Sequence, residues 1–159
     1  MKVIFLDFDG VITSLKSKWR LIPDKMDLVR RICEETGAKI VISSSWRMAD
    51  LKNTISYITC PTAPYVDGNP YSLVEFTIGV TKFLYKWDYI KECGDKSSRG
   101  EEIKEWLDSH PNVEDYIILD DDGFDFYDFQ LPHYIETSYE TGISEDDVEK
   151  AIKYFKKSS

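Results

Sequence analysis

Cysteine and histidine are scarce in this sequence of 159 residues, and their spacing argues against several kinds of site. The three cysteines, Cys33, Cys60 and Cys93, are odd in number, widely spaced and without a Cys-x-x-Cys pair. This argues against a disulfide framework and against a zinc site. The two histidines, His110 and His133, have no serine or cysteine partner that would suggest a nucleophilic triad. We expect all five side chains to be structural.

The sequence also lacks a long apolar run, an internal repeat and a low-complexity segment. No stretch is long enough to span a bilayer, and Asp7 comes too early for the apolar part of a secretory signal. With 42% hydrophobic and 31% charged residues, we expect one globular domain over residues 1–159, cytoplasmic and without a membrane partner. The net charge of −9 argues against broad attraction to nucleic acid but leaves room for a local basic groove.

The order of apolar segments predicts an α/β fold. Residues 3–6 and 38–42 are predicted as buried strands, and the helix between them should end at Gly37. A strand, a helix and a strand form one unit of a parallel sheet, so we expect a three-layer, doubly wound parallel sheet. The remaining predicted elements are a helix over 46–58, a loop over 59–71, a hairpin over 73–85 around Gly79, a helix over 100–110, strands at 116–119 and 133–135, and a last helix that begins with a capping box at 144–147.

Two aspartates follow the first predicted strand, in the sequence Asp7-Phe-Asp9-Gly10. Asp7 and Asp9 are two positions apart, so in an extended chain they share a face, and Gly10 lets the backbone turn sharply or come close to a substrate. Two carboxylates this close repel each other unless a cation lies between them or one takes a proton. The pattern predicts a Mg²⁺ site with a reactive carboxylate; the alternative is a surface turn in which one aspartate caps the next element.

Polar residues follow two other predicted strands and open one helix. Residues 43–45 are three serines after the second strand, Arg99 precedes the helix over 100–110, and residues 120–122 are three aspartates after the strand at 116–119. The carboxyl ends of parallel strands meet at one edge of a sheet, where ligands bind. We therefore expect these segments to converge with Asp7 and Asp9 on one site.

In this order the four segments resemble motifs I to IV of the haloacid dehalogenase (HAD) superfamily of phosphotransferases over essentially the whole chain. The resemblance implies that Asp7 attacks phosphorus and forms an aspartyl-phosphate, and that Asp9 is the general acid and base. It also implies that Mg²⁺ is held by Asp7, the backbone carbonyl of Asp9 and Asp120, with Asp121 as a further ligand or as an acid behind the first.

The resemblance leaves alternatives open in motifs II and III. Ser44 is the expected phosphate-binding hydroxyl, Ser43 is the alternative, and Ser45 could contribute its backbone N–H or cap the next helix. Arg99 stands where the family commonly has a lysine, and it would neutralise the nucleophile and the phosphate. Lys96 is the alternative for this role, and Arg99 could instead be a solvated surface residue.

The spacing of the motifs leaves no room for a full cap, only for a small insert within residues 59–98, and an open site suits a large phosphorylated substrate. The sequences around Trp46 and Arg47, around Trp106 and near the C-terminus are similar to the small HAD domains of "Swiss army knife" RNA-repair proteins. That likeness implies removal of terminal phosphate from nucleic-acid ends. Arg47 would then bind a second phosphate, and Trp46 would either stack on a base or pack inside the protein. A small-molecule phosphatase and a non-catalytic phosphate-binding relative are the alternatives. The oligomeric state is not predicted.

Overall fold

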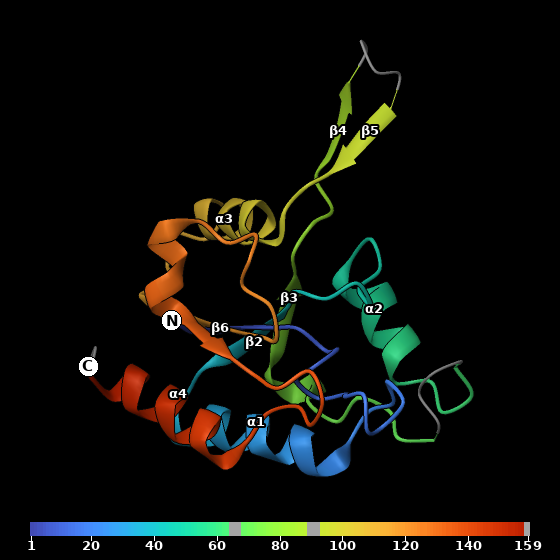
Figure 1. Ribbon diagram of the computed structural model, residues 1–159, viewed down its shortest axis with the longest axis vertical. Helices are drawn as coiled ribbons and strands as arrows, with labels where there is room; N and C mark the ends of the chain where they lie inside the picture. Colours follow the sequence, from blue (N-terminus) through green and yellow to red (C-terminus); the bar gives the residue numbers. More distant parts are fainter. Residues whose placement is uncertain (64–67, 89–92, 158–159) are drawn as a thin grey trace.

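The computed structural model describes residues 1–63, 68–88 and 93–157. For residues 85–88 and 93–96 it describes the backbone and not the side chains. Its centre is a five-stranded, all-parallel sheet with the order β3-β2-β1-β6-β7 (Figure 1). The five strands are β1 (Lys2–Leu6), β2 (Lys39–Ile42), β3 (Thr77–Val80), β6 (Asp115–Asp120) and β7 (Tyr134–Glu136). The strand β1 lies in the middle, with β2 and then β3 on one side and β6 and then β7 on the other, as in a doubly wound sheet.

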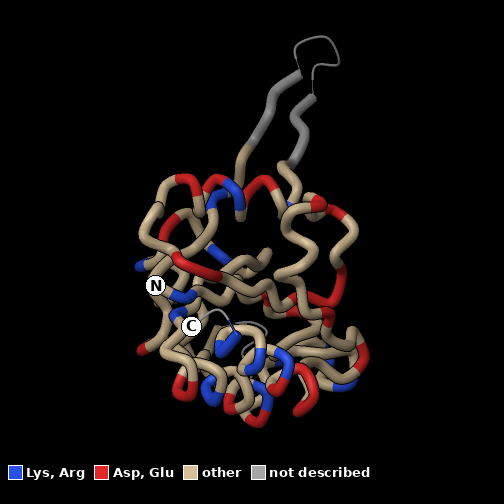
Figure 2. Tube along the Cα trace, turned by 90° about the vertical axis from the view of Figure 1, so that its left-hand side faces the viewer, with Lys and Arg blue, Asp and Glu red and all other residues tan. Residues whose placement is uncertain are grey.

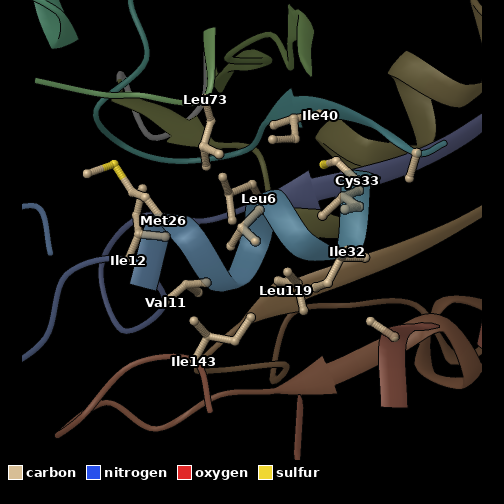
Figure 3. Packing of buried hydrophobic residues seen from close by; sticks show 14 of the residues in the cluster. Leu6, Val11, Ile12, Met26, Ile32, Cys33, Ile40, Leu73, Leu119 and Ile143 are labelled. Atoms are coloured by element: carbon tan, nitrogen blue, oxygen red, sulfur yellow. The ribbon is translucent and has the colours of Figure 1, made fainter. Parts of the chain in front are cut away.

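Helices cover both faces of the sheet. The helices α1 (Pro23–Thr36) and α4 (Glu145–Lys157) lie side by side on one face, and α3 (Arg99–Asp108) lies on the other (Figure 1). Successive residues of β1 alternate between the two apolar cores. Leu6 packs in the core on the α1 side (Figure 3). Phe5 packs with Trp106 of α3 on the other side. The predicted three-layer α/β fold is confirmed.

The ends of α1 and α4 follow the local chemistry of the sequence. Pro23 opens α1, and Gly37 ends it in the left-handed region, with φ of 75° and its N–H donating to the Cys33 carbonyl at 2.9 Å. At the start of α4, Ser144 and Asp147 exchange N–H to side-chain hydrogen bonds of 2.9 and 3.2 Å, which is the predicted capping box.

Two predicted elements differ from the structure. The helix α2 (Leu51–Ile58) begins five residues later than predicted, because the Asp50 side chain accepts the Asn53 N–H at 2.8 Å and caps the helix there. The hairpin over 73–85 is wrong: a 3₁₀ turn (Val74–Phe76) leads into β3, which pairs in parallel with β2. Gly79 lies inside β3 and is therefore not a turn residue. A Cβ at this position would lie 3.2 Å from the indole nitrogen of Trp106.

The small insert is a two-stranded antiparallel hairpin of β4 (Tyr85–Asp88) and β5 (Cys93–Lys96) that projects from the rest of the molecule (Figure 1). Over the coloured part of the trace, acidic residues are spread widely and not gathered at one end (Figure 2). Among the described residues, no helix is both long and apolar enough to cross a bilayer.

Candidate active site

The strand register brings Asp7, Ser43 and Asp120 side by side at the carboxyl edge of the sheet. Leu6 is paired with both Ile42 and Leu119. The ladder continues one residue further, because the Asp7 N–H donates to the Leu119 carbonyl at 3.0 Å and the Ser43 N–H donates to the Leu6 carbonyl at 2.8 Å. By the alternation of a strand, these three residues fall on the α3 side of the sheet.

A cluster of three carboxylates forms at this edge. Asp7, Asp120 and Asp121 each offer an oxygen, and these oxygens all lie within 4.8 Å of one another. Asp7 and Asp120 are buried, and Asp121 is half-buried. Backbone N–H groups support the two buried acids, from Phe8 to Asp7 at 2.9 Å and from Asp122 to Asp120 at 3.1 Å. The predicted convergence of the first and fourth motifs is therefore observed.

Burial raises the pKa of the Asp7 carboxyl above its ordinary value of 3.8, and burial together with the charge of Asp7 raises the pKa of Asp120 in the same way. The Arg99 guanidinium lowers both pKa values in part. Desolvated carboxylates that repel one another fit a divalent cation, and an all-oxygen donor set suits Mg²⁺. Both candidates for the fourth motif, Asp120 and Asp121, belong to this cluster; the expected Asp9 carbonyl ligand stays a prediction.

Gly10 makes room for one of these acids. Its φ is +84°, and a Cβ at this position would lie 2.5 Å from the Asp121 carboxyl carbon. The Gly10 carbonyl also accepts the Thr137 hydroxyl at 2.6 Å. The sequence suggested that Gly10 lets the backbone approach a substrate; in the structure, it lets the first motif approach the fourth.

Asp9 is held apart from the carboxylate cluster by two neutral donors. The Thr13 hydroxyl at 2.8 Å and the Trp46 indole N–H at 3.1 Å both donate to Asp9 Oδ1. Both of these donors bind Oδ1 and not Oδ2. The sequence analysis missed both partners, although a threonine four residues after Asp9 in an otherwise apolar turn was an available signal.

The three serines of the second motif have different surroundings. Ser44 is buried, and its Oγ accepts a hydrogen bond from the backbone N–H of Trp46 at 3.2 Å. Ser45 is exposed. Ser43 Oγ is buried and, in the part of the chain that the structure describes, has no hydrogen-bond partner. Since buried hydroxyls are almost always hydrogen-bonded, the unpartnered Ser43 Oγ is a group that a ligand would satisfy. The choice between Ser43 and Ser44 for phosphate binding stays a prediction.

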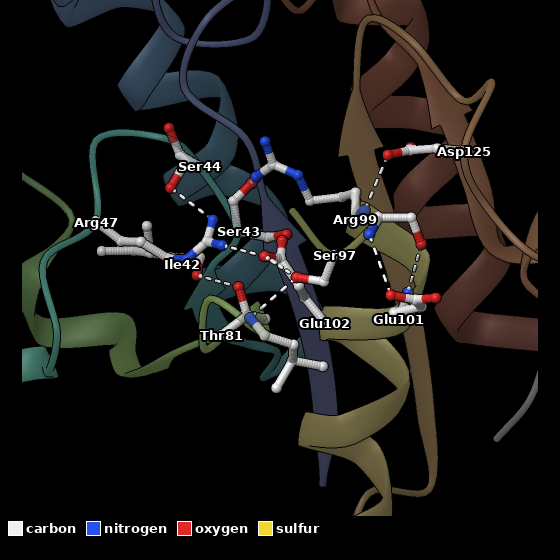
Figure 4. Close-up of polar contacts among 12 residues, drawn as sticks. Ile42, Ser43, Ser44, Arg47, Thr81, Ser97, Arg99, Glu101, Glu102 and Asp125 are labelled. Carbon is white, nitrogen blue, oxygen red and sulfur yellow. Dashed lines mark hydrogen bonds and ion pairs between the residues drawn. The ribbon is translucent and has the colours of Figure 1, made fainter. Parts of the chain in front are cut away.

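Arg99 lies where the third motif was predicted. Its guanidinium donates to the Ser43 carbonyl, and its backbone N–H donates to Asp125 Oδ2 at 2.9 Å (Figure 4). Ser98 caps α3 through a capping box with Glu101, which fixes the first turn of the helix. Arg99 is therefore anchored at the site and not free in solvent. The side chain of the alternative, Lys96, lies outside the described residues.

Arg47 does not present its guanidinium to a second phosphate, as the sequence analysis expected. It is buried, with Nη2 2.6 Å from Glu102 Oε2 and Nη1 donating to the Ser44 carbonyl at 2.7 Å (Figure 4). Phe83 stacks on the guanidinium at 3.7 Å, and burial lowers the pKa of Arg47 to about 10, which leaves it charged at neutral pH. The reason for the difference is Glu102, a counter-charge 55 residues away in the chain.

Removal of one partner of the Arg47–Glu102 pair should destabilise the fold. We expect Glu102→Gln to lower the free energy of unfolding by about 3–5 kcal/mol, because a buried guanidinium loses its counter-charge. Urea denaturation measures this. In the double variant with Arg47→Met, the loss should be smaller than the sum of the two single losses. Asp108→Asn, which breaks an exposed pair with Lys104 on the same helix, is the control, and its cost should stay below about 1 kcal/mol. A comparable loss in the control would contradict the buried role.

Protons and Mg²⁺ should compete at the carboxylate cluster. Because folded Asp7 and Asp120 have pKa values above the ordinary 3.8, their protonated forms stabilise the metal-free fold at low pH, and this stability is lost as pH rises through the raised pKa values. Mg²⁺ should therefore raise the melting temperature more at about pH 8 than at about pH 6. Thermal unfolding with and without Mg²⁺ tests this, with Asp120→Asn as the variant in which the difference shrinks. An equal shift at both pH values would argue against a metal at these oxygens.

A model of the family described as the HAD domain in Swiss Army Knife RNA repair proteins matches residues 3–148. Comparisons with curated proteins and with solved structures gave no match. The matched range contains the carboxylate cluster, the serine turn after β2 and the start of α3 with Arg99. The chain therefore belongs to the family of HAD domains found in Swiss Army Knife RNA repair proteins.

Proposed function

We propose that this HAD domain is a Mg²⁺-dependent phosphohydrolase that acts through an aspartyl-phosphate and removes terminal phosphate from nucleic-acid ends. Family membership supports a phosphohydrolase in general. The observation that carries the proposal is the different environment of Asp7 and Asp9. Asp7 lies among charges at the strand edge, whereas Asp9 is held by two neutral donors. Two carboxylates in unlike environments can serve as nucleophile and as proton carrier.

In the first step, the Asp7 carboxylate attacks phosphorus, the bond from phosphorus to the leaving oxygen breaks, and an aspartyl-phosphate forms. The hydrogen bond from Phe8 fixes the orientation of the Asp7 carboxylate, and its position one residue beyond β1 keeps it on a rigid element. The proton on Asp9 Oδ2 passes to the leaving oxygen. In the second step, Oδ2 takes a proton from the water that attacks phosphorus, so phosphate is released and Asp7 is restored.

Charge neutralisation is divided among several groups. Asp7, Asp120 and Asp121 would hold Mg²⁺, which would supply positive charge to offset that of the phosphoryl group. Arg99 contributes a cation that lowers the pKa values of Asp7 and Asp120 and lies against the Ser43 carbonyl. The Ser43 hydroxyl donates to a phosphoryl oxygen, which gives this buried group the partner that it lacks among the described residues. Phosphoryl transfer depends mainly on such positioning and neutralisation.

A nucleic-acid end as substrate rests on the family to which the chain belongs and on the open architecture. The family occurs in RNA repair proteins, which supports a nucleic-acid end as the substrate. The insert between the second and third motifs is a narrow hairpin and not a domain that covers the site. A site without a large cap accommodates a chain end more readily than it excludes water from a small metabolite.

Asp7→Asn should abolish hydrolysis, because an amide cannot accept the phosphoryl group. The fold should remain intact, with a metal-free melting temperature equal to or above that of the wild type, because the change removes one charge from a repulsive cluster. Release of phosphate and thermal unfolding measure the two effects. Asp122→Asn is the control, since this exposed side chain lies in the same loop as Asp120 and Asp121 but outside the cluster. Turnover in the Asp7→Asn variant would exclude Asp7 as the nucleophile.

Asp9→Asn should slow steady-state turnover by about 10²–10⁴-fold, the usual effect of losing a general acid or base. With p-nitrophenyl phosphate, the leaving group departs without a proton, so the first turnover should remain fast and release about one equivalent of nitrophenolate before the water step limits the rate. Stopped-flow absorbance follows this burst. A slow first turnover with no burst would mean that Asp9 acts on something other than proton transfer.

A further inference from the structure

A hollow of about 320 Å³ opens beside Asp9. Besides Asp9, its walls include Trp19, Trp46, Met48 and Tyr57. This volume lies at the lower end of the roughly 300–1,000 Å³ range of small-ligand pockets. We call it the aromatic hollow. A larger hollow, of about 670 Å³, lies between α1 and α4 and touches none of the site residues.

The aromatic rings of this hollow are partly open to solvent and held in place. Trp46 packs its ring against Phe8, with centroids 5.5 Å apart, while its indole N–H is bound to Asp9. Trp19 packs against Tyr139, with centroids 4.9 Å apart. Trp19, Trp46 and Tyr57 are all only half-buried. Pre-positioned aromatic surface of this kind stacks well on nucleobases, whatever their sequence.

The backbone that presents Trp19 is strained. Lys18 and Trp19 have φ values of 54° and 63°, a left-handed conformation that residues with large side chains rarely adopt. The Trp19 N–H donates to the Ser14 carbonyl at 3.0 Å, and Ser14 and Ser17 are joined by further hydrogen bonds that hold the turn. Strain that the surroundings maintain in this way is typical of functional positions.

The segment that carries Trp19 is basic within an acidic protein. Between Asp9 and Asp24 the sequence contains Lys16, Lys18 and Arg20 and no acidic residue, whereas the whole chain has a net charge of −9. These three cations are exposed. A local positive charge at the rim of an aromatic pocket suits a strand whose bases stack while its phosphates lie outside.

Resting on the proposed phosphohydrolase function, we propose that the aromatic hollow binds the base of the terminal nucleotide of a nucleic-acid strand. This nucleotide is the leaving group of the reaction, and Asp9 protonates its leaving oxygen. Trp19 and Tyr57 provide the stacking surface. Trp46 lies beside them and donates its indole N–H to Asp9. The basic segment of residues 16–20 binds the next phosphate of the strand. The hollow thereby selects a nucleotide end over other phosphate esters.

Trp19→Ala tests the base contact. We expect kcat/KM for a phosphate-ended oligonucleotide to fall at least about fivefold, and kcat/KM for p-nitrophenyl phosphate to stay within about twofold of wild type, because only the first substrate carries a base. Trp19→Phe keeps an aromatic ring and should recover most of the loss. Phe129→Ala, an exposed aromatic residue outside the hollow, is the control and should change neither value. Equal losses on both substrates, or none on the oligonucleotide, would overturn the proposal.

A binding measurement separates this proposal from the function on which it rests. An unphosphorylated oligonucleotide should quench tryptophan fluorescence of the Asp7→Asn protein, and Trp19→Ala in that background should remove most of the binding. If wild type fails to hydrolyse p-nitrophenyl phosphate, the proposed phosphohydrolase is wrong, whatever the quenching shows. If wild type hydrolyses it but the oligonucleotide does not bind, the aromatic hollow is not a base site.

Lys18→Asn tests the phosphate contact, because asparagine tolerates the left-handed conformation while it removes the charge. In wild type, kcat/KM for the oligonucleotide should fall with added salt more steeply than kcat/KM for the corresponding mononucleotide. Lys18→Asn should reduce that difference in slope. Identical salt slopes for the two substrates in wild type would show that residues 16–20 bind no further phosphate.

Discussion

Mutual repulsion among three carboxylates at one edge of the sheet is the constraint on which the rest of the site depends. Asp7 and Asp120 cannot move apart, because each continues the hydrogen-bond ladder of its strand, and Asp121 is held near them across Gly10. Two backbone N–H groups and the guanidinium of Arg99 offset part of this repulsion. The remaining repulsion fits a divalent cation, so the register of the parallel sheet itself brings together a set of oxygens that suits one.

Two arginines hold the turn after β2, and only one of them faces the acids of the site. Arg99 donates to the Ser43 carbonyl and Arg47 donates to the Ser44 carbonyl, so consecutive peptide groups are fixed from two directions. Glu102 neutralises Arg47 within the fold, whereas Arg99 retains its electrostatic effect on Asp7 and Asp120. The turn is thereby ordered without a hydrogen bond from the Ser43 hydroxyl to any residue that the structure describes.

The sequence was sufficient for four of the five strands of the sheet, all but β3, and for the acids at its edge. Both depend on local order, because a buried apolar run ends and the next residue is a carboxylate. This reasoning predicted Asp7, Asp120 and Asp121 together and located Arg99 at the start of a helix. It failed where a side chain finds its partner across the fold. Nothing near Arg47 indicates Glu102, and nothing near Asp9 indicates the Trp46 indole. The parallel partner of β3 is β2, more than 30 residues earlier in the chain.

The base of the β4–β5 hairpin is closed on itself: the Ser97 N–H donates to the Leu84 carbonyl, and the Leu84 N–H donates to Ser97 Oγ, both at 2.9 Å. The two ends of the insert therefore leave and rejoin the domain at one point, and its strands pair with each other and not with the central sheet. Phe83 and Ser97 flank that point. Phe83 stacks on the guanidinium of Arg47, and the Ser97 hydroxyl donates to Glu102. An insert attached in this way can lengthen, shorten or be exchanged over evolutionary time while the strands that bear the carboxylate cluster keep their register.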